Sequence, residues 1–334
     1  MDIYINTRGT YLHQKNGEFL LESEGKKTLI SPLKVRSIVA AESVLITTDV
    51  IKLALEHNID IVILDHFGNP CGRFWHSRFG STANIRRRQL EIAATEEGVS
   101  IAKEWIINKL ESSIKHLKEL EYKRHSKIDM IENEVKEIKG YIKKLNELTE
   151  GTAGELRTTI MAYEGNAARH YYKIISTLLP KPFQFKGRSF RPAKDEFNSL
   201  LNYSFGILYS RVEKACIIAG LDPFTGILHT DNYNKKSFVF DVIENYRYLS
   251  WSTIFSLFSQ KKVNKSYFHT ANDSYSLNKE GKRLVQEEFG KKLEKKVLYK
   301  RRKISNLDRI QQDCHNIAKR LITGNNEEEN DKCD

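Results

Sequence analysis

Short hydrophobic runs alternate with polar residues and turns along the first 80 residues of the chain. The runs are DIYIN, YLHQ, FLLES, SIVAA, SVLITT and IDIVILD, and residues such as Gly and Asn separate them, as in the segment HFGNPCG. Runs of about four to eight residues between such turns predict strands and hairpins. Together with one short helix, they predict a β-rich, sandwich-like domain over residues 1–85.

A repeat of three to four residues marks the helices. The segment VIKLALEHN places Val50, Leu53 and Ala54 on one face behind Thr48 and Asp49, which can cap it. In the second part of the chain the same spacing relates a longer set of apolar residues: Ile101, Trp105, Ile106, Leu110, Ile114 and Leu117.

This pattern predicts a larger all-α domain over residues 93–322 and a linker over residues 86–92, so the fold class is α+β. Breaks in the helices are expected at Gly140 and at residues 150–154, and a proline-rich loop follows residue 180.

The charge of the chain favours a polyanionic partner. Its 334 residues carry a formal net charge of +11, which by itself does not choose among DNA, RNA and anionic lipid. The sequence has no apolar stretch of about 20 residues, so we expect no membrane span and a cytoplasmic location.

The acidic tail, residues 323–334, is expected to be disordered. The four cysteines are scattered and are expected to be free thiols.

Three short segments carry the side chains of a candidate divalent-metal site. They are YEGNAARHYY with Glu164, GLDPFTGILH with His229, and FVFDVIENYR with Asp241 and Glu244. Taken singly, a solvated helical Glu or a hydrogen-bonded His is the commoner explanation for each. Taken together, carboxylate oxygens and one imidazole nitrogen suit Mg²⁺ or Mn²⁺ and predict chemistry on phosphodiesters.

With their surroundings, these segments resemble the integrase family of the CRISPR adaptation machinery, the larger of its two general spacer-acquisition proteins. The stretch from SIVAAESV to CGRFW also resembles the β-rich dimerisation domain of that family. The resemblance implies that Glu164, His229 and Glu244 are the catalytic metal ligands. Asp241 then either shares the ion or holds one of its ligands.

The resemblance also implies a reaction and partners. Short fragments of double-stranded DNA would be inserted at a CRISPR repeat when a 3′ hydroxyl attacks a phosphodiester. The protein would be a homodimer that joins a small ferredoxin-like second adaptation protein. Two alternatives remain open: a structure-specific nuclease acting on branched repair intermediates, and a non-enzymatic DNA-binding assembly subunit.

Basic and amide side chains supply candidates for DNA contact. Some lie at the domain junction, some in the family-like segment RSFRPAKDEFNSLLNYSFGILYS, and some in KKLEKKVLYKRRK, which is interpreted as a helix with one basic face. A merely solvated lysine-rich face explains the last segment equally well. The candidates are Arg86, Arg87, Arg88, Arg188, Arg191, Asn198, Asn202, Tyr203, Arg247, Lys292, Lys295 and Lys296.

Overall fold

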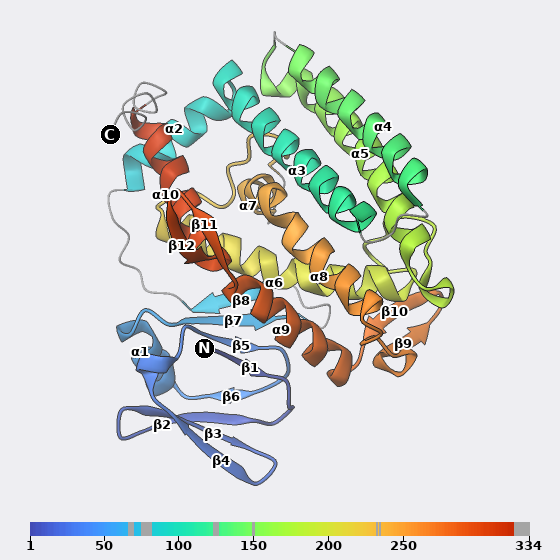
Figure 1. Cartoon of the computed structure of the whole chain (residues 1–334). Coiled ribbons are helices and arrows are strands. Elements are labelled where there is room, and N and C mark those ends of the chain that lie inside the picture. The colour runs from blue at the N-terminus through green and yellow to red at the C-terminus, as the bar shows by residue number, and fades with distance from the viewer. Residues whose placement is uncertain are drawn as a thin grey trace. The chain divides into compact units, whose positions relative to one another are not determined.

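The computed structural model describes residues 1–65, 70–74, 82–122, 127–148, 151–231, 233 and 235–323 (Figure 1). The chain divides into two compact units, Met1–Gly80 and Ser81–Asp334. The acidic tail expected over residues 323–334 lies outside the described residues from residue 324 onward, as do residues 66–69 of the expected turn.

The first unit holds two four-stranded sheets. One has the order β1 (Asp2–Ile5), β5 (Ser37–Ala40), β7 (Asp60–Leu64) and β8 (Pro70–Phe74). The other has the order β4 (Lys26–Ile30), β3 (Glu18–Ser23), β2 (Tyr11–Lys15) and β6 (Leu45–Ile46). The sequence did not predict β4 and β8. Each lies at the edge of its sheet, and β4 is mostly exposed, so neither has the apolar alternation of a half-buried strand.

The inner faces of these two sheets share one core, which confirms the expected strand-rich first region. Ile38 and Ile61 of the first sheet cluster with Leu12 and Phe19 of the second. Helix α1 (Thr48–Glu56) packs into the same cluster. Its N-cap is Thr47, whose side chain accepts a hydrogen bond from a backbone N–H, so the cap lies one residue before the expected one.

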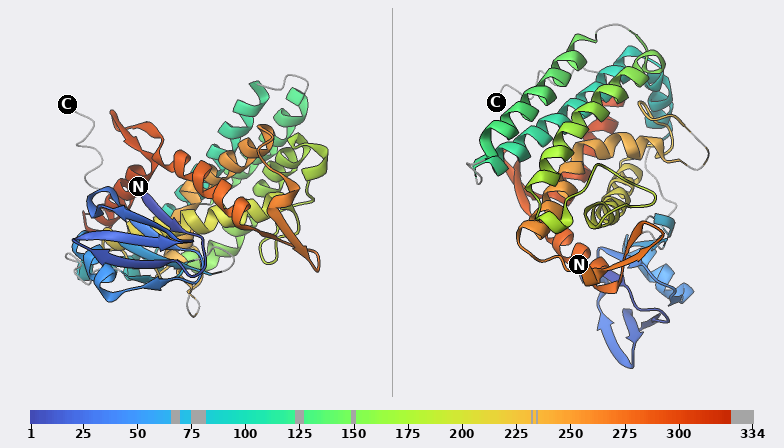
Figure 2. Two further views of the ribbon diagram at one scale, coloured as in Figure 1. Left: turned by 90° about the horizontal axis from the view of Figure 1, so that it is seen from below. Right: turned by 90° about the vertical axis from the view of Figure 1, so that its right-hand side faces the viewer.

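The second unit is mainly helical, as expected (Figure 2). Its helices are α2 (Thr82–Ala93), α3 (Glu96–Tyr122), α4 (Ile128–Glu147), α5 (Ala153–Leu178), α6 (Glu196–Ile218), α7 (Ser237–Ile243), α8 (Arg247–Ser259), α9 (Lys279–Glu294) and α10 (Asn306–Thr323). Short 3₁₀ turns are η1 (Pro32–Lys34) in the first unit, and η3 (Lys181–Phe183), η4 (Glu244–Tyr246) and η5 (Lys265–Tyr267) in the second. Within the described residues, no helix is both long enough and apolar enough to cross a bilayer.

Three expectations for this unit need correction. Residues 86–92 form the middle of α2 and not a linker, and the boundary between the compact units falls at Gly80. Helix α4 continues through Gly140, where a Cβ atom would meet open space. The unit is also not wholly helical. It contains two hairpins, β9 (Phe268–Ala271) with β10 (Ser274–Leu277), and β11 (Lys296–Tyr299) with β12 (Arg302–Ser305).

Helix α3 forms the spine that positions the site. Its apolar stripe, including Trp105, Leu110 and Leu117, is buried in the main core of the unit. The stripe packs against α4, α5 and α8, and the turn η4 lies beside it. Because a 27-residue helix held on several sides is rigid, the side chains it presents to its neighbours have fixed places.

Candidate functional site

A cavity of about 800 Å³ in the helical unit is lined by all three predicted metal ligands. Glu164 comes from α5, His229 from the loop before α7, and Glu244 from η4. Six cationic side chains line this cavity and only two carboxylates do. A cavity with this excess of positive charge suits a phosphate-bearing substrate.

Lys109 of α3, which the sequence analysis did not select, lies at the centre of the site. Its ammonium group contacts a carboxylate oxygen of Glu164 and lies 2.5 Å from Oε2 of Glu244. The second contact lacks hydrogen-bond geometry, so it is a pairing of charges. Burial would lower the pKa of Lys109, but the two glutamates outweigh burial and raise it. The lysine is therefore charged and joins α3 to α5 and η4.

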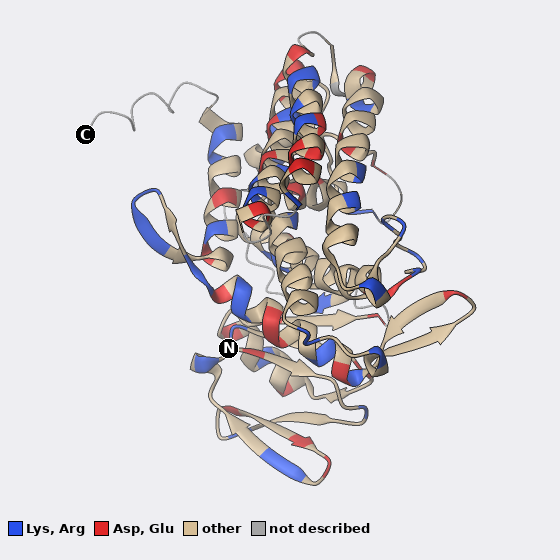
Figure 3. Ribbon diagram, turned by 45° about the vertical axis from the view of Figure 1, so that its right-hand side comes forward, with Lys and Arg blue, Asp and Glu red and all other residues tan. Residues whose placement is uncertain are grey.

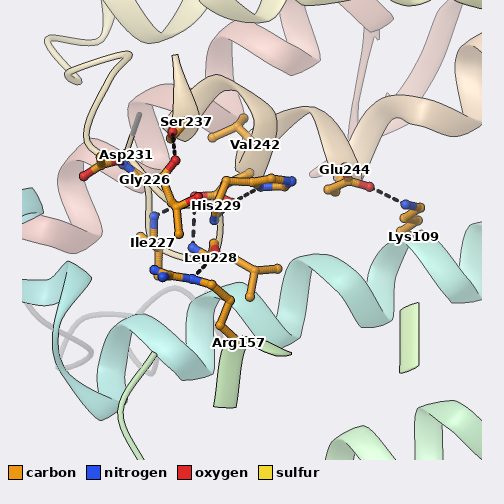
Figure 4. A network of polar contacts seen from close by, with 12 residues as sticks. Lys109, Arg157, Gly226, Ile227, Leu228, His229, Asp231, Ser237, Val242 and Glu244 are labelled. Carbon is orange, nitrogen blue, oxygen red and sulfur yellow. Dashed lines mark hydrogen bonds and ion pairs between the residues drawn. The ribbon is translucent and has the colours of Figure 1, made fainter. Parts of the chain in front are cut away.

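Glu244 is ionised although its side chain is only 5% exposed. Burial would raise its pKa, but the positive charges of Arg247 and Lys109 lower the pKa to about 2. Arg247 reaches the other oxygen of Glu244, with its Nη2 atom at 2.7 Å. Two cations therefore hold this buried carboxylate in place, and Figure 4 shows the contact of one of them, Lys109, with Glu244.

His229 is oriented by Asp241. Nδ1 of the imidazole lies 2.6 Å from Oδ1 of Asp241, which leaves Nε2 as the nitrogen available for a ligand. The same carboxylate accepts hydrogen bonds from the backbone N–H groups of Ile227, Leu228 and His229. Both oxygens of Asp241 are thus engaged. This arrangement favours the interpretation in which Asp241 holds a metal ligand over the one in which it shares the ion.

Other contacts fix the loop before His229 (Figure 4). Asp231 accepts a hydrogen bond from the backbone of Gly226 at 2.9 Å. A Cβ atom on Gly226 would lie 2.5 Å from the carbonyl oxygen of His229, so only glycine fits there. Gln89 of α2 is fully buried and bonds the backbone at Asp222 and Thr225. The imidazole is therefore held by the folded loop and by a distant helix.

The residues present fit a hard divalent cation. Glu164 and Glu244 converge on one positive charge, the ammonium of Lys109, and His229 of the same cavity keeps one ring nitrogen available. Carboxylate oxygens with a neutral imidazole are a donor set for Mg²⁺ or Mn²⁺. Within the described residues, no three acidic, histidine or cysteine side chains are already gathered around one point. The ammonium of Lys109 occupies the position between the two carboxylates.

The DNA-contact candidates from the proline-rich loop and α6 differ in position, because one lines the cavity and others are buried in the core. Arg188 lines the cavity and donates to the side chains of Asn198 and Asn202. Asn198 is fully buried and Tyr203 is 3% exposed, with its hydroxyl bonded to Gln286. The two asparagines thus orient an arginine, and Tyr203 belongs to the core. Burial explains why Asn198 and Tyr203 do not serve the DNA contact expected of them.

The remaining basic candidates are dispersed. Arg247 belongs to the site as a partner of Glu244, and Arg191 is exposed beside the ring of Phe190. Arg86, Arg87 and Arg88 lie on α2, where Arg88 pairs with two glutamates.

The basic helical face expected for Lys292, Lys295 and Lys296 does not form. Helix α9 ends at Glu294, Lys295 caps it, and Lys296 begins β11. The β-branched and aromatic residues of the segment VLY explain the change, because they favour a strand.

One signal in the sequence could have identified Lys109. It lies four residues after Trp105 and three after Ile106, on the face of α3 that the apolar stripe buries. A lysine in a buried stripe needs a charged partner, so its position alone predicts nearby carboxylates. No comparable signal marks Gln89, whose partners lie more than 130 residues away in the sequence.

A cationic cavity with two converging carboxylates and an oriented imidazole places the protein among enzymes that act on phosphodiesters. The chain belongs to the Cas1 family of CRISPR-associated proteins, whose model matches residues 3–291.

Curated relatives and solved structures agree with this family. An Archaeoglobus fulgidus CRISPR-associated endonuclease Cas1 is 30% identical over 91% of this chain and 92% of its own length. A Thermus thermophilus Cas1 endonuclease is 26% identical over 88% and 87%. The fold is shared with a Thermotoga maritima Cas1 protein, with a TM-score of 0.80, 23% identity and 97% of each chain covered. It is also shared with a casposase bound to an integration product, with a TM-score of 0.82, 22% identity and coverage of 96% and 90%.

Proposed function

We propose that this endonuclease is a metal-dependent DNA integrase that inserts short duplex fragments at a CRISPR repeat. The observation that carries the proposal is the convergence of Glu164 and Glu244 on one positive charge inside a cationic cavity. The casposase relative, whose solved structure contains an integration product, supports joining in addition to cutting.

In the proposed reaction, the 3′ oxygen of the inserted strand attacks a target phosphorus. One P–O bond forms as the attacking 3′ hydroxyl gives up its proton, one P–O bond breaks, and the target's 3′ oxygen leaves and takes up a proton. Water in place of the 3′ hydroxyl gives hydrolysis. A divalent ion held by Glu164, His229 and Glu244 would supply charge stabilisation at the reacting phosphate. We propose that Arg188, which donates to Asn198 and Asn202 and lines the cavity, binds a phosphate oxygen.

The proposal includes an assembly. Two strand transfers on opposite strands need two sites, so we propose a homodimer paired through the strand-rich unit, because sheet edges are self-complementary surfaces. One structure that shares the fold, with a TM-score of 0.77 and 20% identity, is a Cas6-RT-Cas1–Cas2 complex. It supports a second adaptation protein as partner, for which we propose the small ferredoxin-like kind, in the cytoplasm with duplex DNA as substrate.

Strand joining tests this function directly. A labelled donor duplex and a plasmid target are incubated with the protein and Mg²⁺ or Mn²⁺, with a chelator as the blank. We expect Glu164→Gln, His229→Ala and Glu244→Gln each to lose joining by about a hundredfold or more, as expected for a site that acts as one unit. Glu213→Gln is the matched control, because Glu213 is also buried, pairs with Lys236 and lies outside the cavity.

The chemistry at the donor end separates the alternatives. A donor with a dideoxy 3′ end cannot be joined but leaves hydrolysis possible, so an integrase loses its joined product with that donor. A branched-DNA nuclease would cut branched substrates and never join the hydroxyl donor. An assembly subunit would show no metal-dependent product at all. Joining that survives in two of the three site variants would remove these residues from the mechanism.

A further inference from the structure

The hairpin formed by β11 and β12 carries a concentration of positive charge. Residues 295–303 include six lysines and arginines and no acidic residue. Figure 3 shows this hairpin as a blue projection of the helical unit, in contrast to the β9–β10 hairpin, which has no Lys or Arg in its strands. The family model ends at residue 291, before this hairpin begins.

The two faces of the hairpin differ. Alternate residues of a strand share a face, so Val297 and Tyr299 lie on one side and Lys296 and Leu298 on the other. The first side is half-buried, and the hydroxyl of Tyr299 donates to Asp313 of α10 at 2.5 Å. The second side is open. Leu298 is 75% exposed there and lies opposite Lys303. One face thus anchors the hairpin and the other is free for a ligand.

The turn of the hairpin has an unusual composition. Lys300 and Arg301 have φ values of 42° and 64°, the left-handed conformation at both central positions of a two-residue turn. Such turns favour Asn, Asp and Gly. The β9–β10 turn follows that preference with Asn272 and Asp273 at φ values of 46° and 57°. Lys300 and Arg301 therefore occupy strained backbone conformations, and Asn, Asp or Gly would adopt these conformations at a lower cost in free energy.

The cations at the tip have no acidic partner in the described part of the chain. The side chains of Lys300, Arg301, Arg302 and Lys303 are exposed, and none forms an ion pair with a described residue. The ring of Tyr299 lies 6.0 Å from the ammonium of Lys300. Like charges gathered on one projection repel each other, and a bound polyanion relieves that repulsion.

We infer that the β11–β12 hairpin is an arm that binds the phosphates of duplex DNA through its open face and its tip. A two-stranded ribbon fits the major groove of B-form DNA, which is about 12 Å wide, whereas the major groove of an RNA duplex is too narrow. Leu298 lies among the lysines, where it can meet sugar or thymine methyl groups. The choice of DNA rests on the proposed function. The contact itself involves no metal and no chemical step.

The test exploits the strained turn. Lys300→Asn with Arg301→Gly removes two charges and installs the preferred turn residues, so the hairpin should not unfold. Affinity for a short labelled duplex is measured by fluorescence anisotropy with a chelator present, between about 50 and 200 mM salt. Two lost phosphate contacts should make the log–log salt slope shallower by about 1.8. The ratio of wild-type affinity to variant affinity should therefore be about tenfold smaller at 200 mM salt than at 50 mM salt.

Matched variants make the result decisive. Lys136→Gln with Lys139→Gln removes the same charge from exposed positions of α4 and should leave the slope near that of the wild type. Leu298→Glu adds a negative charge to the open face without touching the turn and should weaken binding. An unchanged affinity and slope in both hairpin variants would overturn the inference. If the wild type shows no metal-dependent joining but the hairpin variants still bind DNA more weakly, only the proposed function is overturned.

Discussion

Replacing Lys109 with Met should weaken the fold and open the site to metal. The ammonium of Lys109 is the positive charge between Glu164 and Glu244. Met keeps the apolar stem that packs within α3 but removes that charge. Two carboxylates then face each other in a cavity, and Arg247 stays paired with Glu244.

The size of the effect follows from burial. Removing one partner from a buried ion pair costs about 3–5 kcal/mol. Arg247 still neutralises Glu244, and solvent reaches the side chain of Glu164, which is 22% exposed. Both effects reduce the cost of removing the ammonium group. We therefore expect about 2–3 kcal/mol of lost stability. For a unit of this size, that lowers the melting temperature by about 5–10 °C.

Thermal melting with and without Mn²⁺ provides the assay. An ion bound at about a hundred times its dissociation constant adds about 2.7 kcal/mol. Because the ion no longer has to displace an ammonium group, Mn²⁺ should raise the melting temperature of Lys109→Met more than that of the wild type. Lys103→Met is the control on the same helix, since the ammonium of Lys103 donates to the carbonyl of Leu148 and forms no ion pair with a described residue. Equal melting of Lys109→Met and wild type, or equal shifts with Mn²⁺, would refute the reasoning.

Four other outcomes are expected. Glu244 has a lowered pKa of about 2 in the fold, so its stabilising effect is complete above its ordinary value of 4.5 and is lost as pH falls toward 2. Glu244→Gln should flatten acid unfolding in that window, measured by circular dichroism. Asp241→Asn should lower the joining rate and speed amide hydrogen exchange in the loop before His229, because Asn accepts fewer of the loop's hydrogen bonds. Gly226→Ala should cost about 1–3 kcal/mol by denaturant unfolding, whereas Gly140→Ala should stabilise by about 1 kcal/mol. Light scattering should show a dimer of the full chain and a monomer once residues 1–80 are removed, and a strictly monomeric full chain that still integrates both ends would contradict the proposed assembly.

The hydrophobic pattern predicts most of the fold because buried positions recur along the sequence with the repeat of a strand or of a helix. After a polar first residue, β5 and β7 are continuous apolar runs, and α3 has a helical stripe of apolar residues. The pattern failed where burial is slight or where tertiary contacts decide. β4 is exposed along nearly its whole length, and the segment around Lys296 contains both helix-forming lysines and strand-forming residues.

The candidate site was predictable in its residues and not in its contacts. Glu164, His229 and Glu244 carry recognisable local segments, and the structure lines one cavity with all three. Nothing in the sequence indicates that the carboxylate of Asp241 accepts hydrogen bonds from three backbone N–H groups of a loop twelve to fourteen positions away. Contacts of this kind depend on how a loop closes, which a periodic pattern does not encode.

The position of Gln89 sets a limit on how the helical unit can be excised. This fully buried side chain belongs to α2, the first helix after the strand-rich unit, and it fastens the loop that leads to His229. A truncation placed in the segment first interpreted as a linker would begin at about residue 93 and would discard that fastening. We expect such a fragment to keep its helical circular dichroism spectrum while the imidazole of His229 loses its fixed orientation. An expression clone intended to retain the nuclease centre must therefore start before Thr82.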